Sequence, residues 1–400
     1  MLKTVILKDF FSFHNEVKIS LNEGANLLLG INGSGKTSFI NALRLLTEGV
    51  YGNGIENLIQ TQWGGYSQIL NCNGKEKAFG IQLTYVFSEK TINNIFFPES
   101  FESDVYYRIT ICPYGPTDYY LDETIWTTSN TKDKIYLDFH NGKGKLLEKP
   151  WTDIEIFQDY ERGINGHELV IKQISDPNQY PFLHLIKNAI ESIAVYNSFN
   201  TGESSNIRQL TKYSTDIRLW KDGENLTQIL NNLKNNYSLD FDRIEDELIK
   251  VNPAYKHIEI NNITGQSYLS LREKNLNMTI GALHISDGTL RFLLLEAIFL
   301  NPNRGNVIAI DEPERGLHPD MIRSVSEMIK EAAKNTQLII ATHSPHLLNY
   351  FDLEDVLVFE KNDYNSSTVK ILSELDFSDL DDELLPGQLW LNGEIGGKRW

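Results

Sequence analysis

The sequence predicts an α/β fold, and three features of the chain support this prediction. The apolar run Asn26–Leu29 is followed by a glycine-rich turn and then by apolar residues at helical spacing. A second apolar run, Val307–Ile310, ends in two carboxylates. The final third of the chain alternates helical and strand patterns, as α/β proteins do.

The glycine-rich turn has the composition of a phosphate-binding loop. Glycines let the backbone curl so that successive N–H groups point at phosphate oxygens, and the following helix N-terminus adds partial positive charge. Lys36 is expected to reach the β- and γ-phosphates, and the Thr37 hydroxyl to bind Mg²⁺. The sequence therefore predicts a nucleoside triphosphate site. Its expected contact residues are Gly30, Asn32, Gly33, Ser34, Gly35, Lys36, Thr37 and Ser38.

The second strand supplies the acids that such a site needs. Asp311 is expected to bind Mg²⁺, and Glu312 to polarise the attacking water as general base. The segment Ser286–Thr289 opens an apolar helix and suits either an anion cradle or an ordinary helix cap. His343 ends another apolar strand, where it is either structural or a hydrogen-bond donor to a γ-phosphate. The expected catalytic residues are therefore Lys36, Glu312 and His343.

The chain divides into four predicted regions. Residues 1–150 hold the phosphate loop and a set of short β-type runs that predict an antiparallel lobe. Residues 151–255 predict a mainly helical insertion, residues 256–372 the second half of the core, and residues 373–400 an acidic, Gly- and Trp-containing tail. The clearest expected strands of the lobe are Phe79–Phe87, Thr91–Phe97, Val105–Cys112, Tyr119–Leu121 and Lys134–Phe139.

Composition limits the partners and the compartment. A net charge of −17 opposes strong non-specific DNA binding, which depends on neutralising phosphates. A local basic face is an alternative to scattered, solvated charges, and would include Lys187, Arg208, Lys212, Arg218 and Lys221. No apolar run approaches the roughly 20 residues that cross a membrane. With no signal-peptide pattern and only two cysteines, we expect a cytoplasmic protein.

These motifs, in this order, resemble the ABC-type ATPases of the structural-maintenance-of-chromosomes (SMC), Rad50 and RecF group. The matches are Gly30–Thr37 to motif A, Val307–Glu312 to motif B, Ser286–Thr289 to the signature, Gly316–Pro319 to the D-loop and His343 to the switch histidine. The chain is most similar to prokaryotic AAA-family ATPases related to the overcoming-lysogenization-defect (OLD) and phage-defence ATPases. The segments Glu312–Pro319, Ala341–Pro345 and Leu389–Gly397 carry this likeness. The resemblance implies a P-loop NTPase core of ABC/RecF type, with ATP and Mg²⁺ as ligands.

Three positions depart from the pattern of the group. The signature lacks the second glycine and the glutamine of transporter-type proteins, although Ser286 and Gly288 remain. The segment Asp9–Phe13 lacks the basic residue that relatives often carry there. Gln62 and Gln82 are candidates for the glutamine of the Q-loop, and both are also explained as structural residues.

The resemblance further implies a head-to-tail homodimer with two ATP molecules at its interface. Ser286 and Gly288 of one subunit would contact the γ-phosphate held by Gly30–Thr37 of the other. Long-armed family members need coiled coils, which the sequence does not predict. Transporter subunits have a signature much nearer to motif A, whereas more than 240 residues intervene here.

The expected output is control of a separate effector in anti-phage defence. An OLD-type nuclease needs a Toprim domain after the ATPase, and the 57 residues after His343 are too few for one. The cluster Asp379–Glu383 is expected to be an exposed acidic loop rather than a metal site. We therefore expect a separate effector such as a Toprim-like nuclease or a toxin. A RecF-like repair ATPase that binds DNA directly is the alternative. Trp390 and Trp400 suit either docking of a partner or packing on the chain's own core.

Overall fold

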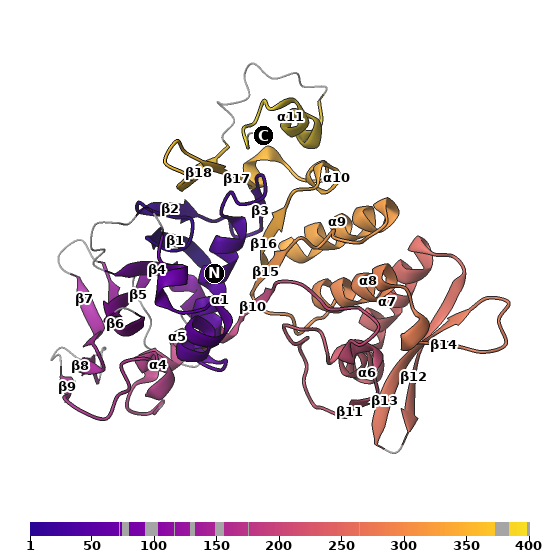
Figure 1. Cartoon of the computed structure of the whole chain (residues 1–400). Coiled ribbons are helices and arrows are strands. Elements are labelled where there is room, and N and C mark those ends of the chain that lie inside the picture. The colour runs from indigo at the N-terminus through magenta and orange to yellow at the C-terminus, as the bar shows by residue number, and fades with distance from the viewer. Residues whose placement is uncertain are drawn as a thin grey trace.

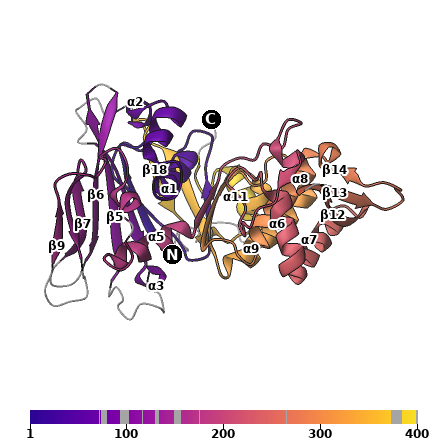
Figure 2. The same ribbon diagram turned by 90° about the horizontal axis from the view of Figure 1, so that it is seen from below.

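The fold has two lobes that meet at a central sheet (Figure 1). The computed structural model describes residues 1–71, 73, 80–92, 103–115, 117–128, 133–148, 156–174, 176–263, 265–372 and 384–397. Seen from below, the antiparallel sheet and the helical lobe lie at opposite ends of the molecule (Figure 2). This arrangement confirms the α/β prediction.

The central sheet brings the predicted motifs to one edge. Within the described residues its strands are ordered β10 (Ile193–Tyr196), β15 (Val307–Asp311), β16 (Gln337–Thr342), β3 (Ala25–Leu29), β17 (Val356–Lys361) and β18 (Ser367–Ile371). All neighbours pair in parallel except β17 and β18. The carboxyl ends of β3, β10, β15 and β16 therefore share one edge, where ligands bind in open α/β sheets.

Apolar side chains on the two faces of this sheet belong to two separate cores. Leu28 packs into the core under the antiparallel lobe, whereas Leu27 and Leu29 pack into the core of the helical lobe. Helix α1 (Lys36–Val50) covers the first face. Helices α8 (Asp287–Phe299) and α9 (Pro319–Ala333) cover the second. Burial on both faces explains why these strands read as continuous apolar runs.

The predicted antiparallel lobe is an eight-stranded sheet in the described chain. Its order is β2 (Val17–Ser20), β1 (Leu2–Lys8), β4 (Ile81–Phe87), β5 (Val105–Tyr114), β6 (Asp118–Thr127), β7 (Lys134–His140), β8 (Lys143–Leu147) and β9 (Phe157–Tyr160). Alternate residues of β6 are buried, as expected for a sheet with one covered face. The Tyr85 hydroxyl donates to the Ala42 carbonyl at 2.6 Å and ties the sheet to α1.

One strand expected in this lobe is wrong where the structure describes it. Thr91 and Ile92 end a short helix, α3 (Glu89–Ile92), and residues 93–97 lie outside the described chain. The β-branched and aromatic residues that suggested a strand did not reveal the helical turn before them. The remaining elements near α1 are η1 (Asn57–Gln62), α2 (Tyr66–Ile69), α4 (Val170–Gln173) and α5 (Pro181–Glu191).

The helical lobe surrounds α8 and ends in a small sheet. Helices α6 (Leu226–Asn236) and α7 (Ser238–Val251) pack on α8, and strands β12 (Tyr255–Ile263) and β13 (Gln266–Glu273) form a hairpin beside them. The remaining pieces are β11 (Thr211–Lys212), β14 (Ile280–Gly281), η2 (Asn206–Arg208) and η3 (Ala282–His284). Within residues 151–255, strand β10 pairs with β15 in the central sheet rather than joining the helices.

The described part of the tail packs on its own core. Helix α11 (Pro386–Asn392) lies against α10 (Pro345–Leu348), and Trp390 is only 7% exposed. The Gly397 N–H donates to Glu360 Oε1 at 2.7 Å. Of the two explanations for Trp390, packing on the core is therefore correct. Trp400 and the acidic cluster at 379–383 lie outside the described residues. The remaining short element is η4 (Leu353–Asp355).

Candidate functional site

The phosphate loop lies between β3 and α1, as the sequence predicts. Lys36 is buried, and its Nζ donates to the carbonyls of Gly30 and Ile31 at 2.6 and 3.1 Å. A side chain on Gly35 would place its Cβ 2.4 Å from Ser367 Oγ, and the φ of Gly35 is +116°. Only glycine therefore fits this turn. Asn32 and Gly33 are exposed at its tip.

Strand β18 contacts the phosphate loop through its first residue, Ser367. The Ser367 hydroxyl donates to the Ser34 carbonyl at 2.6 Å, and its oxygen lies 2.7 Å from Ser12 Oγ. The Ser12 hydroxyl in turn donates to Ser38 Oγ at 3.1 Å. This chain of hydroxyls holds the loop against the antiparallel lobe, and spacing in the sequence did not predict it.

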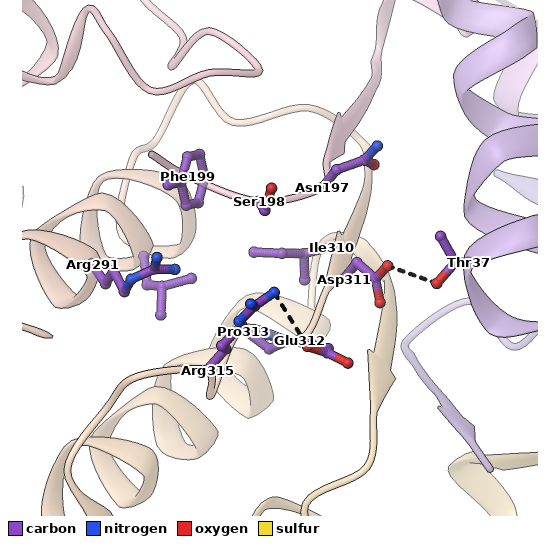
Figure 3. Close-up of a pocket in the computed structure, with 11 residues that line it drawn as sticks. Thr37, Asn197, Ser198, Phe199, Arg291, Ile310, Asp311, Glu312, Pro313 and Arg315 are labelled. Carbon is purple, nitrogen blue, oxygen red and sulfur yellow. Dashed lines mark hydrogen bonds and ion pairs between the residues drawn. The ribbon is translucent and has the colours of Figure 1, made fainter. Parts of the chain in front are cut away.

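The expected metal-binding residues are in contact. The Thr37 hydroxyl donates to Asp311 Oδ2 at 3.0 Å (Figure 3). Burial raises the pKa of Asp311, while the Thr37 hydrogen bond lowers it. Burial lowers the pKa of Lys36, against the nearby charges of Asp311, Glu312 and Glu314. A hydroxyl and a carboxylate at the foot of a phosphate loop are oxygen ligands of the type Mg²⁺ prefers.

The side chains of Glu312 and His343 are in contact at the ends of adjacent strands. His343 Nδ1 lies 3.0 Å from Glu312 Oε1, and Arg315 lies 4.0 Å from the other oxygen. The φ of Glu312 is +51°, an uncommon conformation for a residue with a side chain. Such strained positions are often found at functional sites.

Glu314 is a buried carboxylate that the sequence analysis did not single out. Its Oε1 accepts the Thr342 hydroxyl at 2.6 Å and lies 3.4 Å from the His343 backbone nitrogen. Burial raises its pKa. Glu314 therefore fixes the end of β16 from which His343 projects.

Replacing Glu314 tests this supporting role. We expect Glu314→Ala to lower the free energy of unfolding by about 1–3 kcal/mol, because the Thr342 hydroxyl loses its acceptor in the buried site. Glu314→Gln retains an acceptor oxygen and is expected to lose less. Urea denaturation of the two variants and the parent measures the difference. An equal loss in both would show that the acceptor is not what Glu314 contributes.

A cavity of about 240 Å³ extends from Thr37 and Asp311 toward α8. Asn197, directly after β10, lines it, and the Asn197 Oδ1 atom is buried without a hydrogen-bond partner in the described chain. The residues not foreseen as site residues are Asn197, Ser198, Phe199, Arg291 and Arg315. The short apolar run Ile193–Tyr196 before Asn197 is the sequence feature that could have indicated it.

The two glutamines considered for the Q-loop lie away from this cavity. Gln62 bonds to Arg44 and Asn57 beyond the end of α1. Gln82 is a strand residue of β4 paired with Lys8 and Thr110. Neither lines the cavity next to Asp311, whereas Asn197 does.

The predicted signature lies on the other lobe. Ser286 caps α8, and its Oγ accepts the Thr289 N–H at 3.2 Å. A Cβ on Gly288 would lie 3.1 Å from the Gly316 carbonyl, so the signature touches the D-loop. Ser286 and Gly288 are not among the residues that line the cavity with Thr37. The ordinary cap is therefore present, and the exposed Ser286 remains free to serve a second role.

Arg208 binds the turn that carries the signature through its guanidinium group. Its side chain is 4% exposed and donates to the carbonyls of Ala282 and Ile285 at 2.6 and 2.7 Å. It also pairs with Asp287 at 2.5 Å. Other members of the proposed basic face are engaged elsewhere: Arg218 with Asn303 and Glu191, Lys221 with Glu48, and Lys187 with the Ile174 carbonyl. Four of the five predicted members of this face are therefore bonded to acceptors of the described chain.

The fold and these motifs define a P-loop ATPase head. A family model described as "AAA domain, putative AbiEii toxin, Type IV TA system" matches residues 25–349. The chain belongs to this family. It is an AAA-family ATPase whose fold is that of the SMC head domains, which confirms the resemblance found in the sequence.

The relatives and solved structures agree with this class. The chain is 25% identical to the retron Ec83 probable ATPase of Escherichia coli over 36% of this chain and 28% of that protein. It is 24% identical to endonuclease GajA of Bacillus cereus over 51% of this chain and 35% of that protein. The match therefore spans about a third or less of each relative. A solved SMC head bound to the C-terminal winged-helix domain of ScpA has a TM-score of 0.56 and 17% identity, covering 93% of this chain and 98% of that one.

The described residues also bear on membrane association. None of the helices in the described part of the chain is both long and apolar enough to cross a membrane.

Proposed function

We propose that this chain binds ATP with Mg²⁺ at Gly30–Thr37 and hydrolyses it. The observation that carries the proposal is the contact between Thr37 and Asp311, 3.0 Å apart although distant in sequence. Glu312 lies beside this pair on the same strand end. The unpartnered Asn197 oxygen faces the same cavity. These residues give a hydroxyl, a carboxylate and an amide oxygen that suit a hydrated Mg²⁺.

Some of the site residues bind the phosphates and the metal, and Glu312 transfers the proton. The loop N–H groups and Lys36 hold the phosphates, while Thr37, Asp311 and Asn197 hold the metal directly or through water. Bound Mg²⁺ neutralises charge that develops on the phosphate oxygens. Glu312 accepts a proton from the attacking water, and His343 orients Glu312 through their 3.0 Å contact.

The signature supports a head-to-tail dimer as the active form. Ser286 is exposed and belongs to the lobe opposite the phosphate loop, so it is available to the ATP of a second copy. In this arrangement Ser286 and Gly288 of one subunit contact the γ-phosphate held by its partner. ATP favours the closed dimer by its higher affinity for that state, and phosphate release reverses the preference.

We infer that the dimer regulates a separate effector in anti-phage defence. The names of the matched relatives, a retron ATPase and an endonuclease, support this assignment. A Toprim-like nuclease or a toxin is the expected kind of effector. The scattered basic side chains give no support to the RecF-like alternative, in which the chain binds DNA directly.

Affinity capture tests this assignment. We expect tagged full-length Glu312→Gln, purified from its native host with ATP and Mg²⁺, to retain a second protein in stoichiometric amount. Lys36→Ala, treated identically, is the matched control and is expected to retain much less, because it cannot form the ATP-bound dimer. Mass spectrometry identifies the retained protein. Recovery of nucleic acid alone would replace the effector model with a repair-type clamp.

A further inference from the structure

Two arginines line the cavity beside Glu312, and among the described residues only Arg315 has a carboxylate partner, Glu312 at 4.0 Å. Arg291 lies on α8 after the signature, and Arg315 lies in the turn that follows β15. Both line the cavity that also contains Thr37 and Asp311. Figure 3 shows the Arg315 guanidinium between Arg291 and Glu312. The positive side chains therefore occupy one end of the cavity and the carboxylates the other.

The positive end of the cavity is incompletely neutralised. Within the described chain Arg291 makes neither a hydrogen bond nor an ion pair, and Arg315 reaches Glu312 only at 4.0 Å. Burial and the neighbouring Arg315 charge lower the pKa of Arg291, against the opposite effect of Asp287. Two guanidinium groups that line one cavity concentrate positive charge there, and an anion between them is stabilised by both.

The shape and chemistry of this space suit a small oxyanion. Guanidinium groups offer planar forks of N–H donors that match phosphate oxygens. The Ser198 hydroxyl lines the same cavity and provides a further polar group. A volume of about 240 Å³ is below the roughly 300–1,000 Å³ of pockets for drug-sized ligands. The cavity is therefore of a size for a phosphate ion rather than for a second nucleotide.

We propose that this cavity is a binding site for inorganic phosphate, held between Arg291 and Arg315 after ATP cleavage. The inference rests on the proposed function, because the phosphate is released at Thr37 and Asp311, which line the same cavity. A phosphate in this position takes Arg315 away from Glu312.

Calorimetric titration of phosphate into the ADP-loaded full-length chain tests this site. ADP and Mg²⁺ are present in excess so that the phosphate loop is occupied, and chloride holds the ionic strength constant. We expect saturable phosphate binding, weakened about 10- to 100-fold in Arg315→Gln and in Arg291→Gln. Arg315 is two-thirds exposed, so its replacement is not expected to disturb folding. Arg323→Gln, a similarly exposed arginine on α9, is the matched control and keeps the parent affinity.

The outcomes separate this site from the proposed ATPase function. ADP binding is measured first in the same calorimeter. If ADP binds but phosphate does not, or if neither arginine variant weakens phosphate, the phosphate site is wrong and the ATPase proposal stands. If ADP itself fails to bind, both proposals fail. Equal weakening in Arg323→Gln would assign the effect to general surface charge and overturn the site.

Discussion

Glu312→Gln is expected to lower the ATP turnover number by about 10²–10⁴-fold while ATP binding persists. The amide cannot accept a proton from water, whereas the phosphate loop and the Thr37–Asp311 contact remain intact. Because cleavage is slowed, the ATP-bound state accumulates, and so does the dimer that it favours. Release of phosphate measures turnover, and light scattering after size-exclusion chromatography measures the dimer.

Glu331→Gln is the matched control for this experiment. Glu331 is an exposed glutamate of α9 that pairs only with surface Lys334 among the described residues. Its replacement is expected to leave turnover and oligomeric state unchanged. Unchanged turnover in Glu312→Gln would show that Glu312 is not the general base. Its contact with His343 would then be structural.

Lys36→Ala is expected to weaken ATP binding about 10- to 100-fold. The substitution removes a buried positive charge that lies near Asp311, Glu312 and Glu314. It also removes the expected charge-assisted hydrogen bond to the phosphates. Fluorescent-nucleotide titration measures the affinity directly.

Lys334→Ala controls for the loss of a lysine. Lys334 is an exposed residue at the end of α9, paired with Glu331 at 2.6 Å. Thermal unfolding of both variants excludes a general loss of structure, since Lys36 also bonds to the Gly30 and Ile31 carbonyls. ATP affinity equal to that of the parent in folded Lys36→Ala would contradict the phosphate-loop assignment.

The parts predicted from sequence are those in which local pattern and chemistry coincide. The run Asn26–Leu29, the glycine turn and the helix after it can form only one arrangement that buries the apolar residues and exposes the loop. The positions of Asp311 and Glu312 were predictable in the same way, because a buried strand ends where polar residues follow its apolar run. Both residues were predicted as metal ligands, and the structure places Asp311 3.0 Å from the Thr37 hydroxyl.

The parts missed depend on contacts between segments distant in sequence. Asn197 becomes a site residue only because β10 pairs with β15 at the edge of the sheet, a pairing that no local pattern encodes. Arg208 appeared as one of several surface charges, yet it is buried because four acceptors lie around it. The strand expected from Thr91 was wrong for a local reason, because β-propensity alone does not exclude a helical turn.

The buried Arg208 has a mechanical consequence. It belongs to the short stretch of chain that follows Asn197, and three of its four hydrogen bonds connect that stretch to the turn carrying Ser286. The fourth, to the Thr201 carbonyl, lies within the stretch itself. We therefore expect a shift of Asn197 to move the turn that carries Ser286, because the hydrogen bonds of Arg208 connect the two segments. In the proposed dimer, the position in which each copy presents its signature to a neighbour would then depend on the segment that begins at its own proposed metal site.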